Sequence, residues 1–182
     1  MQERWRQVVH LLFGCAIALS IAVFPPEWTL PFYAAALLIG SILTDAVERG
    51  RRVPIITPLL EELEREDSGP GRGAYYFVVS ALACLVLFGP FRAGVGIFVL
   101  ALLDSVATMA GMYLGRHRIY NNKSLEGFLV GTLFTAVLLL PFLSPERAVL
   151  VALFGGVIEL LSPGDDNLVI PPAVCLVLAL WS

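Results

Sequence analysis

Residues 93–114 read AGVGIFVLALLDSVATMAGMYL, and this stretch decides the fold. A helix that crosses a bilayer needs about 20 mostly apolar residues, and this stretch contains a single ionisable residue, Asp104. Further apolar stretches precede and follow it, and several of their boundaries carry proline or glycine turn signals. The expected spans are 8–24, 30–46, 74–89, 93–114, 128–143, 147–161 and 168–181. The sequence therefore predicts an all-α, polytopic transmembrane bundle of about seven helices.

Composition supports the same class. Hydrophobic residues make up 58% of the 182 residues and charged residues 15%, and the mean hydropathy is +0.82. A soluble domain carries roughly a quarter charged residues, so we expect one integral membrane domain over residues 1–182. No basic stripe typical of nucleic-acid binding is present, so no nucleic-acid partner is expected. The three cysteines lie in apolar runs and indicate neither a disulfide framework nor a zinc site. A homo-oligomer remains an open alternative to a monomer.

Basic residues indicate the orientation. Ten of the twelve lysines and arginines fall in the N-terminal segment and in the second and fourth connections, whereas only Arg92 and Arg147 fall on the alternate side. Basic residues accumulate in cytosolic loops, which predicts a cytosolic N-terminus and an external C-terminus. The compact chain favours the plasma membrane of a prokaryote as its location.

The second connection, residues 48–73, is the longest. Within it, residues 58–66 place leucines on one side and carboxylates on the other, which predicts a short amphipathic helix. Such a helix either lies on the membrane surface or covers a site as a lid.

Asp104 lies at a position where an ionisable side chain is energetically unfavourable. An aspartate near the centre of a span costs about 2.5–3.5 kcal/mol on insertion scales, and ionisable residues inside a membrane are functional candidates. Helical spacing puts Thr108, Gly111 and Gly115 on the same face as Asp104. This face fits either a ligand site or close helix packing around a protonated or paired aspartate.

The fourth connection gathers cations before the next span. Lys123 is the only lysine in the chain and, with Ser124, stands where a helix begins. The N–H groups at a helix start favour phosphate, and Arg116 and Arg118 add positive charge. Glu126 could hold a metal ion or orient Lys123. The alternative is ordinary positive-inside flanking with Ser124 as a helix cap.

The sixth connection, residues 162–167, contains no basic residue but contains Asp165, Asp166 and Asn167. Hard oxygen ligands of this kind suit Mg²⁺, which keeps waters and substrate phosphates as further ligands. A helix cap at Asp166 or Asn167 is the alternative reading. Glu159, one turn earlier, fits a functional or a structural role equally well.

Together these residues favour phosphoryl transfer at the cytosolic face. That chemistry needs cations for a polyphosphate, carboxylates for Mg²⁺ and a base for the attacking hydroxyl. The chain has no Gly-x-x-x-x-Gly-Lys-Ser/Thr loop, so it is not a P-loop enzyme. Asp104 lies about 16 Å before Gly115 along a straight helix, so the site must be deep or the helix must break near Gly111.

Five motifs in order over nearly the whole chain resemble the membrane lipid kinases that use CTP, which are the yeast-type diacylglycerol kinase, dolichol kinase and phytol kinase group. The matching stretches are Arg6-x-x-x-His10-x-x-x-Gly14, Gly73-Ala74-Tyr75-Tyr76-Phe77, Asp104-x-x-Ala107-x-x-x-Gly111-x-x-x-Gly115-Arg116, Asn122-Lys123-Ser124-x-Glu126-Gly127 and Asp165-Asp166-Asn167-Leu168-x-x-Pro171.

The resemblance implies transfer of the γ-phosphate of CTP, with Mg²⁺, to the hydroxyl of a membrane lipid alcohol such as diacylglycerol, a polyprenol or an isoprenoid alcohol. The expected catalytic residues are Asp104, Lys123 and Glu126. The expected nucleotide- and phosphate-binding residues are Arg116, Arg118, Asn122, Lys123 and Ser124. The expected metal ligands are Asp165, Asp166, Glu126 and Asp104, with Asp104 either a ligand or the base.

Two other functions compete. The Lys-Ser-x-Glu-Gly element is also similar to one in phosphatidate cytidylyltransferases, which form a CDP-lipid and release pyrophosphate. Those enzymes continue to a second lysine and a Pro-Gly-His-Gly-Gly signature, whereas this chain reads Pro163-Gly164-Asp165-Asp166, which favours the kinase. A small proton-coupled or lipid transporter is the alternative of another class, but the chain shows no internal repeat of the kind common in transporters.

Overall fold

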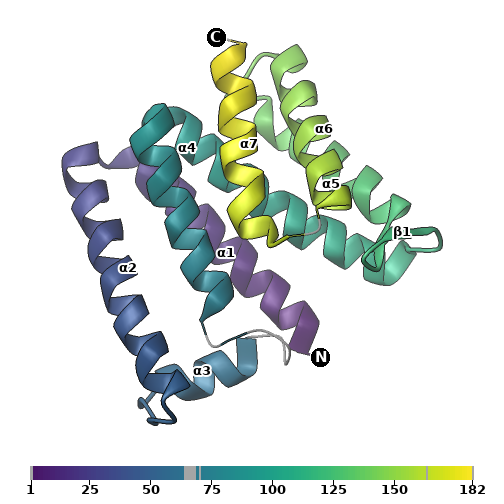
Figure 1. Cartoon of the computed structure of the whole chain (residues 1–182). Helices are drawn as coiled ribbons and strands as arrows, with labels where there is room; N and C mark the ends of the chain where they lie inside the picture. The colour runs from purple at the N-terminus through teal and green to yellow at the C-terminus, as the bar shows by residue number, and fades with distance from the viewer. Residues whose placement is uncertain (1, 64–68, 70, 163, 182) are drawn as a thin grey trace.

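The computed structural model describes residues 2–63, 69, 71–162 and 164–181, and it is a bundle of helices (Figure 1). The helices are α1 (Gln2–Val23), α2 (Pro26–Glu48), α3 (Ile56–Leu63), α4 (Arg72–Leu114), α5 (Leu125–Leu139), α6 (Pro145–Leu161) and α7 (Asp166–Leu180). Two short strands, β1 (Arg118–Tyr120) and β2 (Lys123–Ser124), pair as an antiparallel hairpin between α4 and α5.

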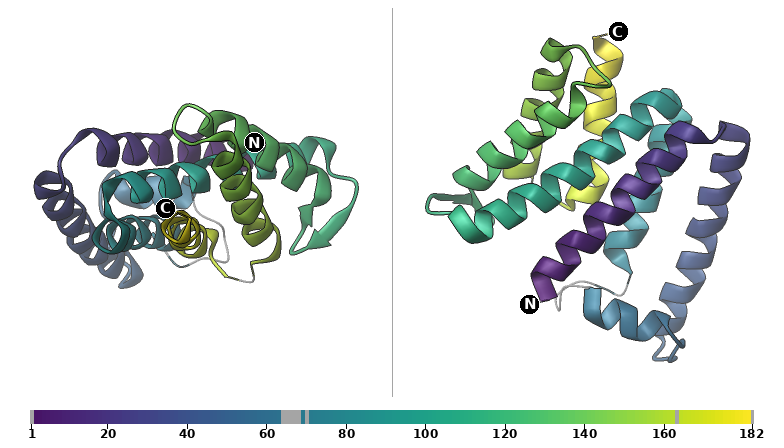
Figure 2. Two further views of the ribbon diagram at one scale, coloured as in Figure 1. Left: turned by 90° about the horizontal axis from the view of Figure 1, so that it is seen from above. Right: turned by 180° about the vertical axis from the view of Figure 1, so that it is seen from behind.

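Helix α4 is the central element, and it bends sharply at Gly89. Gly89 has φ +79° and ψ +169°, a backbone conformation that favours glycine, and Pro90 follows it and cannot donate a helical hydrogen bond. The bend divides α4 into a first half, residues 72–88, and a second half, residues 90–114, which run back beside each other (Figures 1 and 2). The expected spans 74–89 and 93–114 are therefore the two halves of one helical element, joined without a loop.

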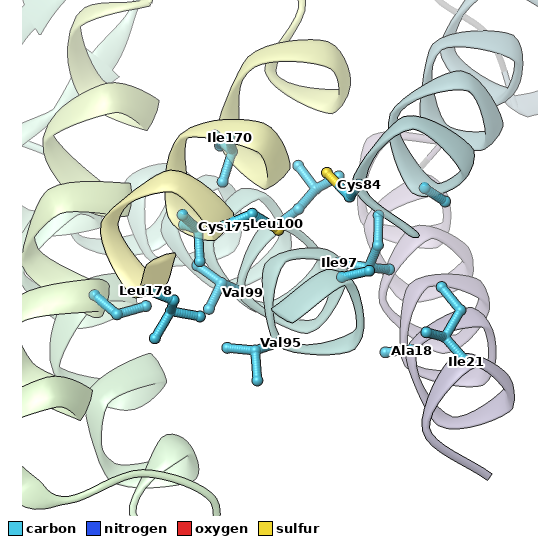
Figure 3. Packing of buried hydrophobic residues seen from close by; sticks show 14 of the residues in the cluster. Ala18, Ile21, Cys84, Val95, Ile97, Val99, Leu100, Ile170, Cys175 and Leu178 are labelled. Carbon is cyan, nitrogen blue, oxygen red and sulfur yellow. The ribbon is translucent and has the colours of Figure 1, made fainter. Parts of the chain in front are cut away.

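The core forms around the second half of α4. Ile97 and Leu100 are fully buried there, and Cys175 of α7 is buried against the same cluster (Figure 3). The close contact with α7 requires a small residue, because a Cβ atom on Gly96 would lie 2.9 Å from the main-chain oxygen of Pro171.

Small residues also bring α5 close to α4. A Cβ atom on Gly127 would lie 2.5 Å from the main-chain oxygen of Ala107 and 3.3 Å from the Cα of Gly111. One on Gly131 would lie 2.9 Å from the Cβ of Ala107. The expectation that the small-residue face of this span permits close backbone approach is confirmed. This packing positions the start of α5, and with it the hairpin, against the second half of α4.

The described helices support a membrane location. Three of them, α1 from Glu3 onward, α2 and α4, are long and apolar enough to cross a membrane, and α5 and α7 are shorter apolar helices. Large apolar side chains such as Leu12, Phe13 and Leu87 are more than half exposed, as expected where helices face lipid rather than water. The protein is therefore a mostly helical membrane protein, while the count of seven crossings and the cytosolic N-terminus stay predictions.

The connections differ between the two ends of the bundle. At one end lie the tight α1–α2 link, the Gly89 bend and the short α5–α6 link, and at the other lie the N-terminus, α3, the hairpin and the α6–α7 link (Figure 1). The amphipathic helix expected at 58–66 is observed as α3, and residues 64–66 lie outside the described part of the chain. The hairpin was not expected. It turns at Asn121 and Asn122, which have φ values of +46° and +62°.

Candidate functional site

Lys123 is the centre of the site. From strand β2, its Nζ donates a hydrogen bond to Asp166 Oδ2 at 2.6 Å and lies 3.2 Å from Glu159 Oε1. It also donates to the main-chain oxygen of Glu159. One ammonium group thus ties the hairpin to the end of α6 and the start of α7. The Glu159 side chain is almost fully buried, at 4% exposure, whereas those of Lys123 and Asp166 are 21% and 17% exposed.

Lys123 keeps its positive charge in this setting. Burial alone would lower the pKa of Lys123, but the charges and hydrogen bonds of Asp166 and Glu159 outweigh burial, and the pKa is raised above its ordinary value. Lys123 is therefore protonated at neutral pH, next to the side chains of Asp166 and Glu159. Glu159, which the sequence left undecided between two roles, belongs to this cluster.

Asp104 lies beside the same cluster and is paired with a histidine of α1. Its Oδ2 is 3.5 Å from Nε2 of His10, and the His10 ring packs edge-on against Phe77 with ring centroids 5.4 Å apart. The Asp104 carboxylate is also close enough to Glu159 and Asp166 to interact with both electrostatically. Helix α4 continues to Leu114 without a break at Gly111. The helix break near Gly111, one of the two arrangements that the sequence allowed, is therefore not observed.

The start of α7 contributes the remaining polar groups. Oδ1 of Asp165 accepts a hydrogen bond from the Asn167 main-chain N–H at 3.1 Å, so Asp165 is the N-cap of α7. The Asn167 side-chain amide donates to the main-chain oxygen of Gly73 at 3.4 Å and joins α7 to the start of α4. The capping role that the sequence offered for this segment is thus observed at Asp165, one residue before Asp166.

Several buried polar atoms in this region make no hydrogen bond. Among the described residues, Asp166 Oδ1, Asn167 Oδ1 and His10 Nε2 are buried and accept or donate no hydrogen bond. A buried polar atom without a partner costs about 1–3 kcal/mol, so natural proteins rarely leave several together. Two of these atoms belong to Asp166 and Asn167 at the start of α7, where a ligand, an ion or water would satisfy them.

The hairpin is braced by Glu126 rather than by Lys123. The Glu126 carboxylate accepts hydrogen bonds from the main-chain N–H groups of Arg116, at 3.0 Å, and His117, at 3.2 Å, and it contacts His117 Nδ1 at 2.6 Å. Ser124 Oγ accepts a hydrogen bond from the Gly127 N–H at 3.1 Å, so Ser124 has the capping role that was the alternative to phosphate binding. The contacts recorded for Glu126 are therefore with the hairpin and not with the Lys123 cluster.

The expected phosphate-binding residues Arg116, Arg118 and Asn122 lie in the hairpin or directly before it. Arg118 donates to the main-chain oxygens of Asn122 and, at 3.2 Å, Gly111, which fixes the hairpin over the end of α4. The side chains of Arg116, Arg118 and Asn122 are exposed. Exposed Arg118 pairs with Ser124, the chain neighbour of the partly buried Lys123. His10 is the residue whose position the sequence did not anticipate, although it stands in the first of the motifs that carry the family resemblance.

The oxygen atoms of this cluster are suitable ligands for an Mg²⁺ ion that is also bound by the phosphates of a nucleotide. Within the described residues, no three His, Cys, Asp or Glu side chains form a complete metal cage. Mg²⁺ does not require one, because it is commonly bound by one or two carboxylates plus waters and phosphates. Asp166 Oδ1 is free to bind an ion, and the carboxylate of the neighbouring Asp165 adjoins it in sequence.

Comparisons with known proteins find one relative that shows the family of the chain and one more distant relative. No family model and no solved structure matches the chain. It is 27% identical over 195 residues to a phytol kinase from Synechocystis, covering 96% of this chain and 78% of that protein. It is 35% identical over 183 residues to the uncharacterized protein MJ1137 from Methanocaldococcus jannaschii, covering 98% of this chain and 93% of that protein. The chain therefore belongs to the family of the archaeal protein MJ1137, with a phytol kinase as a more distant relative.

Proposed function

We propose that the protein is a CTP-dependent lipid kinase that transfers the γ-phosphate of CTP to the hydroxyl of a membrane lipid alcohol at the cytosolic face. The observation that carries the proposal is Lys123, which is held between Asp166 and Glu159 and lies near Asp104. The distant similarity to a phytol kinase supports a kinase and favours an isoprenoid alcohol over diacylglycerol as the acceptor. The plasma membrane of a prokaryote remains the proposed location.

The cations bind the nucleotide in this proposal. The triphosphate displaces Asp166 from Lys123 in part and accepts hydrogen bonds from the Lys123 ammonium, while Arg116 and Arg118 bind its outer phosphates from the hairpin. Asn122 and the N–H groups near Ser124 complete the cradle. Glu126 acts indirectly. It accepts hydrogen bonds from the main-chain N–H groups of Arg116 and His117, and these bonds hold the hairpin, and with it Lys123, in position.

The carboxylates have two roles in this proposal: some bind the metal ion, and one accepts a proton from the acceptor alcohol. Asp166, with Asp165, would hold Mg²⁺, which neutralises charge on the phosphates when bound. Asp104, oriented by His10, accepts the proton of the acceptor hydroxyl. The hydroxyl oxygen forms a bond to the γ-phosphorus, the bond between that phosphorus and its bridging oxygen breaks, and CDP leaves with the electron pair.

The test is a phosphorylation assay with purified protein in detergent. Labelled lipid is expected from γ-labelled CTP and Mg²⁺ with one of phytol, geranylgeraniol, dolichol or diacylglycerol, and less label is expected from ATP. The label should be lost in Lys123→Ala and Asp166→Ala and retained in Arg147→Ala, a control on an exposed residue of α6 at the opposite end. Release of pyrophosphate with phosphatidic acid would replace the kinase with a cytidylyltransferase, and no product from any substrate would refute both.

A further inference from the structure

Lys123 has two partners, and they bind it in different ways. Glu159, in the last turn of α6, offers the Lys123 ammonium two oxygen atoms, its side-chain Oε1 at 3.2 Å and its main-chain oxygen. Asp166, the first residue of α7, offers one, its Oδ2 at 2.6 Å. The contact with α6 therefore includes the main chain, whereas the contact with α7 is made by a side chain alone.

The contact with α6 belongs to the end of that helix. The last four main-chain oxygens of a helix have no partner within the helix, and Glu159 is among the last four residues of α6. A lysine that donates to such an oxygen is a common way to end a helix, and the partial negative charge at the C-terminus favours a cation there. Rotation of the Glu159 side chain would leave this hydrogen bond in place. Lys123 is thus fixed to the end of α6.

Helix α6 is closely packed one turn before Glu159. A Cβ atom on Gly155 would lie 2.9 Å from the Leu103 side chain of α4, so the two helices are in close contact there. The Glu159 side chain is only 4% exposed, and a buried carboxylate that loses its cation is strongly unfavourable. Little water could replace Lys123 at this position. Glu159 is therefore the fixed partner of Lys123.

Asp166 is the partner that can be exchanged. Its Oδ2 accepts the hydrogen bond from Lys123, while its Oδ1 is buried and makes no hydrogen bond. Its side chain is 17% exposed, compared with 4% for Glu159. A divalent cation bound at Oδ1 would neutralise the carboxylate and weaken its attraction for the ammonium. Asp166 can thus give up Lys123 for a metal ion without remaining an unpaired charge.

We propose that Glu159 is a positioning residue that keeps Lys123 in place, and that Asp166 is an exchangeable partner which Mg²⁺ draws away from Lys123. The inference rests on the proposed function, because it explains how Lys123 stays in position while phosphates replace Asp166. The metal ion and the nucleotide then act on the same contact: the metal ion binds the carboxylate, and the phosphates bind the ammonium. Each therefore favours the binding of the other.

The first test follows Lys123 by its chemical reactivity, since it is the only lysine in the chain. The protein in detergent is treated briefly with an amine-reactive succinimidyl ester while Mg²⁺ is added without nucleotide, and modified Lys123 is separated from the modified N-terminus by peptide mass spectrometry. We expect Mg²⁺ to raise the modification rate about two- to fivefold, the effect of losing one partly exposed ion pair. Asp166→Asn should abolish this response. A wild-type protein that does not respond to Mg²⁺, or a response that persists in Asp166→Asn, would overturn the exchange.

The second test removes the fixed partner. Glu159→Gln keeps the size of the side chain without its charge, and Glu146→Gln, exposed at the start of the same helix, is the matched control. At saturating Mg²⁺ we expect Lys123 to react at least about fivefold faster in Glu159→Gln than in the wild type, because the more buried ion pair is lost. Glu146→Gln should match the wild type, and chelation of Mg²⁺ should reverse the increase, which a general loosening of the fold would not show. Equal rates in Glu159→Gln and the wild type would overturn the role of Glu159.

A further variant and the nucleotide complete the experiment. Glu159→Asp, with the same charge on a shorter side chain, should give an intermediate rate and serves if Glu159→Gln does not fold. CTP added with Mg²⁺ should protect Lys123 relative to Mg²⁺ alone. A response to Mg²⁺ without phosphorylation of any alcohol would refute the kinase and retain the exchange. Phosphorylation by a protein in which Lys123 never responds to Mg²⁺ would retain the kinase and overturn the exchange.

Discussion

Replacement of Lys123 by methionine separates the structural and catalytic roles of the cluster. Lys123→Met keeps most of the apolar stem but leaves Asp166 and the almost fully buried Glu159 facing each other without a cation. Removing one partner of a buried ion pair costs about 3–5 kcal/mol. Because the Lys123 side chain is 21% exposed, we expect the lower end of that range, about 3 kcal/mol.

The change should be visible in thermal unfolding. For a chain of this length each kcal/mol shifts Tm by about 2–4 °C, so Lys123→Met should lower Tm by about 6–12 °C. Fluorescence-detected unfolding in one detergent, with Arg147→Met as control, measures this. Adding Glu159→Gln removes the buried carboxyl group that has lost its partner, and the double variant should recover at least half of the loss in Tm while remaining inactive.

Two outcomes would refute this reasoning. An unchanged Tm in Lys123→Met would mean that the ion pair contributes nothing, as exposed pairs often do. Recovery of phosphotransfer in Lys123→Met/Glu159→Gln would mean that Lys123 serves folding alone, and the assignment of Lys123 to the phosphates would then be wrong.

Three further predictions address neighbouring contacts. Gly127→Ala should destabilise the protein by about 1–3 kcal/mol through overpacking against Ala107, measured as a lower Tm, with Gly40→Ala unaffected in its open site. Glu126→Gln should loosen the hairpin, because the carboxylate that binds two main-chain N–H groups loses its charge; faster tryptic cleavage at Arg118 in limited proteolysis would show this. Asp165→Asn should keep the α7 cap, since asparagine caps equally well, so an unchanged Tm with a higher Mg²⁺ requirement would report lost metal binding.

The sequence alone predicted those site residues that are energetically unfavourable or rare in their own segment of the chain. Asp104 stood out because an aspartate inside an apolar span is expensive, and Lys123 because no other lysine is present. The structure brings Lys123 and Asp166 into contact from elements 43 positions apart. The proximity was expected from loop alternation alone, because both connections fall on the same side of a bundle.

Other features depend on packing that no local pattern reveals. Glu159 could face lipid, water or a cation, and only the approach of β2 to α6 decides that it pairs with Lys123. His10 meets Asp104 because α1 crosses the second half of α4 at that level. The hairpin had a usable signal, since paired asparagines adopt positive φ more readily than most residues, but two strands this short carry no periodicity.

The connections at the two ends of the bundle differ, and this difference bears on the end at which substrate and product enter and leave. At the end with the Gly89 bend, the α1–α2, α4 and α5–α6 connections are tight turns built from described residues, and they offer little surface that could grip a water-soluble molecule. Every charged or hydrogen-bonding group of the site comes from the other end. In the proposed reaction, the nucleotide would therefore enter, and the product would leave, at this same end of the bundle.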